Sequence, residues 1–238
     1  MNGPGGMYEG LAPKGRWSGE VRLIPEMLER PATWRKPRLV FAGSMSDLFH
    51  ERLPDSAIRS VLETIRQNER HTFQVLTKRA ERMMRFLDGA VPIPNLWLGV
   101  SVEDDRTAQE RIPYLIDTPA VLRFVSYEPA LGLVEWPSFA ESLGWLIAGG
   151  ESGPNARRPD VAWFRSARDY CQATATPFLF KQWGTWSEDG RKVGKHAAGR
   201  LLDGREWLEF PNRIHPDLVP PGGQRFTDEW FQAGRGAP

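Results

Sequence analysis

The stretch LWLGVSVEDDRTAQERIPYLI, residues 96–116, contains one complete strand-and-helix unit, and the fold follows from the repetition of this unit. Its first part, Leu96–Val100, is a short apolar run rich in strand-forming residues, as expected of a buried β-strand. Polar residues come next. Thr107 and Glu110 then form a T-x-x-E capping box ahead of an apolar pattern with helical spacing. Pro113 is expected to kink or shorten that helix.

Five further runs of the same kind occur along the chain, and the centres of the runs lie roughly 22 to 35 residues apart, the length of one βα unit. The six predicted strands are Arg38–Gly43, Thr72–Leu76, Leu96–Val100, Val121–Val125, Gly144–Ala148 and Pro177–Phe180. Their apolar character is continuous, which is typical of parallel strands buried on both faces. Helical spacing recurs between them, for example after the predicted N-cap Asp160. The pattern predicts an α/β fold, either an open doubly wound sheet or a full or partial barrel.

Glycine and proline, 23 and 20 of the 238 residues, gather at both ends of the chain. We interpret residues 1–19 as an irregular lead-in, residues 20–184 as the body of the fold, and residues 185–238 as a small C-terminal appendage and tail. Within the appendage, Asp203–Gly204 is a hairpin-turn signal. We therefore treat the appendage as an extension of the body and not as a separate domain.

The composition excludes several classes of protein. The 31 Lys+Arg and 30 Asp+Glu residues give a formal net charge of +1, which argues against a broadly basic nucleic-acid surface. No apolar run approaches the ~20 residues of a membrane-spanning helix, and the N-terminal residues lack signal-peptide features, so we expect a cytoplasmic protein without a membrane partner. The single cysteine, Cys171, excludes a disulfide framework and a Cys-rich metal site built from this chain alone. The composition predicts no oligomeric state.

Each of the six predicted strands is followed by polar residues. In a parallel sheet these strand ends lie along one rim, where α/β folds place their ligand sites. Eight of the polar residues are predicted to bind a small polar ligand or cofactor: Ser44, Ser46, Asp47, Lys78, Gly149, Gly150, Glu151 and Ser152. Three others directly follow apolar runs, where an ionised group needs a partner or a task, and are the predicted catalytic residues: Glu103, Glu128 and Lys181. The rim is therefore the predicted functional site.

Several of these assignments have a structural alternative. Asp47, Asp104 and Ser152 are also typical caps of the helices that follow them. The pair Gly149–Gly150 is explained equally well by a tight turn. The chain has neither the G-x-G-x-x-G fingerprint nor a P-loop, which disfavours ordinary dinucleotide and P-loop sites, and it lacks the G-x-S-x-G elbow of hydrolases.

Seven blocks of sequence carry a resemblance to a known family. They are WRKPRLVFAGSMSDLFHE (34–51), HTFQVLTKRAERM (71–83), IPNLWLGVSVED (93–104), RFVSYEPALG (123–132), LIAGGESGPNAR (146–157), PFLFKQWG (177–184) and VGKHAAGRLLDGREWLEFP (193–211). Through these blocks, which span most of residues 20–211, the chain resembles a phage-associated bacterial family of uncharacterised proteins, the three-cysteine-motif proteins. The resemblance implies a partial (β/α) TIM-like barrel of about six parallel strands, similar to radical S-adenosylmethionine enzymes.

The resemblance also implies a cofactor, and the chain departs from the family at that point. Members typically begin with C-x₆-C-x₂-C, which would supply three thiolates to a [4Fe–4S] cluster whose open iron holds S-adenosylmethionine. This chain lacks the motif, and Cys171 lies on a predicted helix. S-adenosylmethionine therefore remains a candidate ligand, while the cluster is not available to this chain alone. A start assigned too far downstream, a truncation, and a lineage that lost the cluster but kept the pocket would each account for the difference.

Two classes of function follow, and the sequence leaves both open. In the first, the resemblance implies that the segment Gly149–Glu151 contacts the amino-acid end of S-adenosylmethionine, and the three predicted catalytic residues orient a substrate or transfer protons. In the second, the chain is a non-catalytic module that binds nucleic acid or a protein partner, as suggested by Lys78, Arg79, Lys181 and nearby tryptophans. Because a fold does not determine a function, neither a substrate nor a reaction is predicted.

Overall fold

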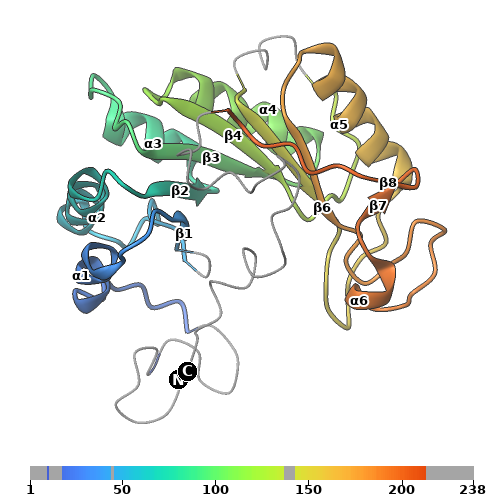
Figure 1. The fold of residues 1–238 in the computed structure, drawn as a ribbon, viewed down its shortest axis with the longest axis horizontal. Coiled ribbons are helices and arrows are strands. Elements are labelled where there is room, and N and C mark those ends of the chain that lie inside the picture. Colours follow the sequence, from blue (N-terminus) through green and yellow to red (C-terminus); the bar gives the residue numbers. More distant parts are fainter. Residues whose placement is uncertain (1–9, 11–17, 44–45, 137–142, 213–238) are drawn as a thin grey trace.

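Six strands form one parallel sheet in the computed structural model, which describes residues 10, 18–43, 46–136 and 143–212. They are β1 (Leu39–Ala42), β2 (Thr72–Thr77), β3 (Leu96–Val102), β4 (Leu122–Tyr127), β5 (Trp145–Gly149) and β6 (Phe178–Gln182). Each strand pairs with the next one in the sequence, so the strand order lacks the reversal that a doubly wound sheet requires. The sheet curls into a half-barrel (Figure 1), which confirms the predicted partial TIM-like barrel.

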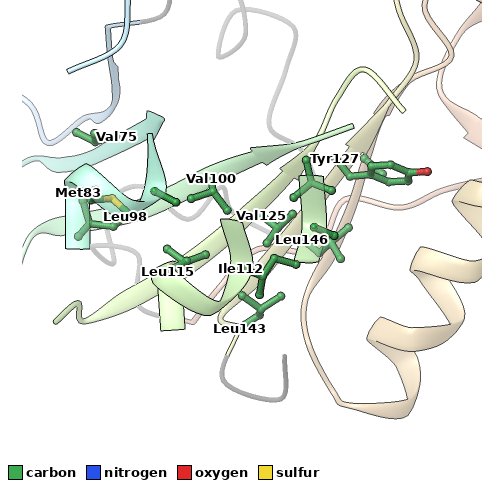
Figure 2. Close-up of a cluster of buried hydrophobic side chains, with 14 of the residues drawn as sticks. Val75, Met83, Leu98, Val100, Ile112, Leu115, Val125, Tyr127, Leu143 and Leu146 are labelled. Carbon is green, nitrogen blue, oxygen red and sulfur yellow. The ribbon is translucent and has the colours of Figure 1, made fainter. Parts of the chain in front are cut away.

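Helices alternate with the strands and cover the outer side of the sheet. They are α1 (Glu26–Thr33), α2 (Asp55–Gln67), α3 (Ala80–Leu87), α4 (Asp105–Asp117) and α5 (Val161–Ala173). Outward-facing strand residues and one stripe of each helix from α2 to α5 form the larger core, and Figure 2 shows Leu98 and Val100 of β3 among helix residues such as Ile112. Each fully buried side chain of this size contributes about 1.5–3 kcal/mol to folding. The outer face is therefore a packing surface.

The inner side of the sheet carries a second, smaller core built mainly from aromatic residues. This inner cluster consists of Trp97, Leu122, Phe124, Trp145, Ile147 and Leu179. The Trp145 ring centroid lies 6.1 Å from those of both Trp97 and Phe124. Gly99 of β3 makes room for Phe124, because a Cβ at this position would lie 2.5 Å from the ring. A complete eight-stranded barrel fills its interior with layers of side chains from all its strands. Here the inner cluster, with its large aromatic residues, comes from the four strands β3 to β6.

The C-terminal part of the described chain closes the edge of β6. It contains the short elements α6 (Lys195–Ala198), β7 (Leu201–Leu202) and β8 (Arg205–Glu206). Residues 207–210 then run antiparallel to β6, and the Phe180 N–H donates to the Trp207 carbonyl at 2.9 Å. Phe210 packs on Trp145, with 5.1 Å between the ring centroids. This segment therefore pairs the sheet edge and covers the inner cluster at the same time.

Polar residues extend the strands further than the sequence predicts. Ser101 and Ser126 belong to β3 and β4 and are partners in the strand register, although we expect loops there from composition. Lys181 is likewise a residue of β6 and does not follow it. Backbone pairing with neighbouring strands outweighs the low strand preference of these side chains. The register of β6 with β5 shifts at Lys181, since Ala148 pairs with Phe180 and Gly149 pairs with Gln182.

Two helix starts test the predicted caps. Asp160 caps α5 as predicted, since its carboxylate accepts from the Ala162 N–H at 2.9 Å. For α4 the alternative assignment of Asp104 as a helix cap is confirmed, and the predicted box of Thr107 with Glu110 is wrong. The Thr107 hydroxyl accepts from the Asp104 N–H at 3.0 Å, so each of the two residues satisfies a backbone donor of the other. Pro113 does not shorten the helix, because α4 continues beyond it to Asp117.

The remaining predictions on organisation concern the chain ends. The Asp203–Gly204 turn between β7 and β8 is confirmed, with φ of 54° and 71° at the two residues. Most of the predicted lead-in, residues 1–19, and the tail beyond residue 212 lie outside the described residues. Among the helices of the described residues, none has the length and apolar character that a bilayer-spanning segment needs.

His71 connects α1 to the first strand from a buried position. The Arg38 N–H donates to Nδ1 at 3.1 Å, so the other nitrogen, Nε2, carries the proton and donates to the Pro31 carbonyl at 3.0 Å. Burial lowers the pKa of His71 below its usual value of 6.5, and the nearby charges of Arg70 and Arg38 add to this effect. A second proton on the ring would displace the Arg38 N–H.

We predict that folding stability decreases as the pH falls through 6.5, the pKa of an unfolded histidine, towards the lower pKa of folded His71. The unfolded chain binds a proton in this window and the folded chain does not, which gives a slope of at most about 1.4 kcal/mol per pH unit. Urea unfolding at a series of pH values measures it. His71→Gln should flatten the curve in this window, whereas the exposed control His196→Gln should not. An unchanged slope in His71→Gln would contradict the assignment.

We also predict that Gly99→Ala destabilises the protein by about 1–3 kcal/mol, because the new Cβ collides with the Phe124 ring. Chemical denaturation measures the loss. In a Phe124→Leu background the same substitution should cost much less, since the smaller side chain leaves space beside position 99. Additive losses in the double variant would show that the two residues do not compete for this space.

Candidate functional site

The loops that follow the six strands contact one another along the C-terminal edge of the sheet, which we call the rim. Backbone hydrogen bonds join the central loops: the Leu131 N–H donates to the Glu103 carbonyl at 2.7 Å, and the Ala130 N–H donates to the Gly149 carbonyl at 3.0 Å. Side-chain contacts join the others, as described below. The structure therefore brings most of the predicted site residues to one end of the half-barrel.

Asp47 joins the first loop to the second. Its carboxylate accepts hydrogen bonds at 2.6 to 3.1 Å from the Phe49 N–H, the Thr77 hydroxyl, the Lys78 N–H and the Arg79 guanidinium. A ligand that bound to this carboxylate would have to displace one or more of these four donors. Ser46 is exposed in the same loop, and Ser44 lies outside the described residues.

Glu103 is a buried carboxylate between two cations. One oxygen accepts from the Lys78 ammonium, and the other accepts from the Arg111 guanidinium at 2.9 Å. Arg111 of α4 also donates to the Ser101 carbonyl at 2.8 Å. Arg111 was not among the predicted site residues. The one feature of the sequence that could have indicated it is its position, about two turns into the helix that follows Glu103 and packs against β3.

Glu128 and Lys181 form a second ion pair on the inner side of the rim. The Lys181 ammonium donates to one Glu128 oxygen at 2.7 Å, and the Gln182 amide donates to the other at 3.2 Å. The Glu128 side chain is 18% exposed and that of Lys181 is 31% exposed. Gly149 leaves space beside this carboxylate, since a Cβ there would lie 3.2 Å from it. Ser152 accepts from the same Gln182 amide at 3.2 Å.

Glu151 is paired within its own loop. Its carboxylate accepts two bonds from the Arg157 guanidinium at 2.8 and 2.9 Å and one from the Arg157 N–H at 2.7 Å. These bonds lower the pKa of Glu151 to about 2. The Glu103 carboxylate also raises the pKa of Arg157, so the two loops lie within electrostatic range. Gly150 is required by the backbone itself, because a Cβ there would lie 2.0 Å from the Trp183 carbonyl oxygen.

The inner face changes from apolar to polar towards the rim. Ser101 follows Gly99 by two residues and Ser126 follows Phe124 by two, so both serines face the inner side just beyond the inner cluster. Both are largely buried. Gln74 of β2 lies on the same face, and its buried amide nitrogen has no hydrogen-bond partner among the described residues. The two serines provide neutral donors and acceptors close to the ends of β3 and β4, whereas Gln74 lies deeper, level with Trp97.

The two tryptophans that follow Lys181 in the sequence, Trp183 and Trp186, are engaged in structural contacts. Trp183 is 1% exposed, packs edge-on against Phe164, and donates its ring N–H to the Leu201 carbonyl at 2.6 Å. Trp186 is half-buried and donates to the Ala156 carbonyl at 2.8 Å. Neither arrangement resembles a platform prepared for a flat ligand.

The residues of this chain do not fit an iron–sulfur cluster held by three thiolates. The one cysteine, Cys171, lies in α5 and is 1% exposed in the larger core, and burial raises the pKa of its thiol. A thiol must lose its proton to bind a metal, and this environment opposes that loss. Among the described His, Cys, Asp and Glu residues, no group of three or more could hold a metal ion.

Two surface hollows lie away from the rim, at the N-terminal edge of the sheet. One is lined by residues around Cys171 and Pro177, and the other, of about 470 Å³, is lined by Ala32 and residues 67–70. Neither touches a predicted site residue. Converging loops and paired charges therefore mark the rim as the candidate site, and neither hollow lies there.

Comparison with known proteins places the chain in a family without assigning an activity. A family model described as "Protein of unknown function (DUF5131)" matches residues 5–211, which is most of the chain. Neither the curated proteins nor the solved structures gave a significant match. Any function therefore has to be argued from the rim itself.

We predict that Asp47→Ala destabilises the protein by about 2–4 kcal/mol, because it leaves several donors of two loops without an acceptor. Urea denaturation measures the loss. The control is Glu51→Ala, which removes the other carboxylate bound to Arg79 but is 64% exposed, and should cost less than about 1 kcal/mol. Similar small losses in both variants would show that Asp47 does not hold the loops.

Proposed function

The chain belongs to the DUF5131 family of proteins of unknown function, and we propose that its rim binds a small ligand that carries an amino-acid group. The observation that carries the proposal is the presence of two lysine–glutamate pairs, Lys78–Glu103 and Lys181–Glu128, at one end of the half-barrel. An amino-acid group has one ammonium and one carboxylate. It can therefore exchange partners with such pairs without leaving any charge unpaired.

The inner side of the rim suits this exchange. Glu128 accepts the ligand ammonium, and Lys181, which it releases, donates to the ligand carboxylate. Ser101 and Ser126 supply hydroxyl groups to the remainder of the ligand. Each charge-assisted hydrogen bond made in this way contributes about 1.5–3 kcal/mol. The Lys181 ammonium also lies 2.7 Å from Glu128, so this pair is the candidate for proton transfer to or from a bound substrate.

The resemblance of the sequence adds a specific candidate, S-adenosylmethionine, whose methionyl end is an amino-acid group. Glu151 is less suited to hold that group than the Gly-Gly-Glu motif implies, since Arg157 of its own loop donates three bonds to it, one from the backbone N–H, and among the described residues the only charged partner of Glu128 is Lys181. We therefore assign the contact to Glu128. No step through an iron–sulfur cluster is proposed. Phage association and a cytoplasmic location stay predictions of the sequence.

A nucleic-acid site at the rim is the weaker alternative. The three cations that suggest it, Lys78, Arg79 and Lys181, each have a carboxylate partner within 3.1 Å. Binding phosphates there would leave several partly buried carboxylates without a partner, which is unfavourable. The balanced charge of the rim favours a zwitterion over a polyanion.

We predict that titration calorimetry detects binding of S-adenosylmethionine to the purified protein and that methionine competes for the site, whereas adenosine does not. Glu128→Gln should weaken the binding roughly 10- to 100-fold, since it removes the charge that accepts the ammonium. The matched control is Glu110→Gln, which changes an exposed glutamate of α4 in the same way and should bind normally.

Thermal unfolding of both variants checks that each remains folded. The absence of heat with S-adenosylmethionine and with methionine would overturn the proposal. So would equal affinity in the wild-type protein and a folded Glu128→Gln variant. Competition by adenosine alone would place the recognition elsewhere than in the two ion pairs.

A further inference from the structure

A group of basic residues lies at the opposite, N-terminal edge of the sheet, around His71. It comprises Arg30, Arg35, Lys36, Arg38 and Arg70, all of them exposed, and we call it the basic patch. His71 shows that its parts lie close together: the ring accepts from the Arg38 N–H, donates to the carbonyl next to Arg30, and has its pKa lowered by the charge of Arg70. The patch therefore joins the end of α1, the segment before β1 and the residue before His71.

The basic patch differs from the cations of the rim in its lack of acidic partners. None of its five side chains forms a salt bridge with a residue that the structure describes, whereas the cations at the rim and the two arginines of α5 that hold Asp203 all do. The segment 30–38 contains four positive charges and no acidic residue. Like charges repel one another, so this grouping is unfavourable unless an anion binds to it.

Local contacts hold part of the patch in place. The Arg38 guanidinium lies over the Trp34 ring at 4.8 Å, and the Trp34 ring packs edge-on against His71 at 5.3 Å. A guanidinium fixed in this way loses little further freedom on binding. The 470 Å³ hollow lined by Ala32 and residues 67–70 adjoins the patch and gives the surface a concave part.

We propose that the basic patch binds the phosphodiester backbone of a nucleic acid, independently of the ligand at the rim. Four of its five residues are arginines, whose planar guanidinium binds phosphate through two parallel hydrogen bonds. The exposed large apolar residues of the described chain all lie outside segment 30–38 and residue 70, which disfavours insertion into a lipid surface. Because the whole chain has a net charge of only +1, we expect the phosphate contacts to be limited to the patch.

The size of the patch sets the expected strength and salt dependence. Five cations that each neutralise one phosphate give a slope of log K against log salt of about −3.5 for single strands and about −4.5 for duplex DNA. Contacts to phosphate carry no base sequence, so we expect similar affinities for oligonucleotides of different sequence. The affinity should be measurable at low salt and fall steeply towards physiological salt.

The test is fluorescence anisotropy with labelled single-stranded DNA, RNA and duplex oligonucleotides of about 20 nucleotides. The double variant Arg35→Gln/Lys36→Gln should weaken binding at least tenfold and reduce the magnitude of the salt slope by about 1.4 units for single strands and about 1.8 units for duplex DNA. The matched control, Arg106→Gln/Lys195→Gln, removes two exposed positive charges elsewhere and should change the affinity less than twofold. Comparison of the affinities for DNA and RNA shows which of the two nucleic acids the patch prefers.

Several results would overturn this inference. These are the absence of binding to every oligonucleotide at about 50 mM salt, equal losses in the patch and control variants, and binding to phosphatidylserine vesicles in place of nucleic acid. The rim proposal fails or succeeds separately, since Glu128→Gln should bind oligonucleotides normally and the patch variant should bind S-adenosylmethionine normally.

Discussion

The aromatic packing of the inner face is the constraint on which the rest of the structure depends. In the part of the chain that the structure describes, the six-strand half-barrel has no opposite wall to fill its interior, and Trp97, Phe124 and Trp145 fill that space from the sheet. The arrangement is sensitive to single atoms, since Gly99 has no room for a Cβ. On β3 and β4 the polar residues of the inner face, Ser101 and Ser126, lie beyond these rings, and the candidate site is therefore at the rim.

Much of the fold could be predicted because its signals are local. Continuous apolar runs located all six strands, and Asp160 located the start of α5. The strand ends were predicted too early because Ser101, Ser126 and Lys181 have the composition of loops, while pairing with neighbouring strands keeps them in the sheet. The choice between an open sheet and a barrel depends on strand order, which no property of a single strand encodes.

The site was predicted in its position more than in its contacts. The ends of parallel strands meet at one edge whatever their sequence, so Glu103, Glu128 and Lys181 could be placed there. Their partners come from elsewhere, and Arg111 in a helix and Arg157 in a loop carry no pattern that identifies them. Whether a carboxylate is available to a ligand depends on such partners, and for this reason the bonds of Glu151 could not be foreseen.

The distribution of charge partners separates the two ends of the molecule. At the rim almost every cation faces a carboxylate, so the fold has already compensated the cost of bringing charges together, and only a ligand with both signs can join without leaving one unpaired. At the N-terminal edge the five basic side chains of the patch form no salt bridge with a described residue, so a bound anion would reduce the repulsion between them. With a net charge of +1, the chain has nearly equal numbers of positive and negative charges overall, and it is their local distribution, not the total, on which the two proposed binding surfaces are based.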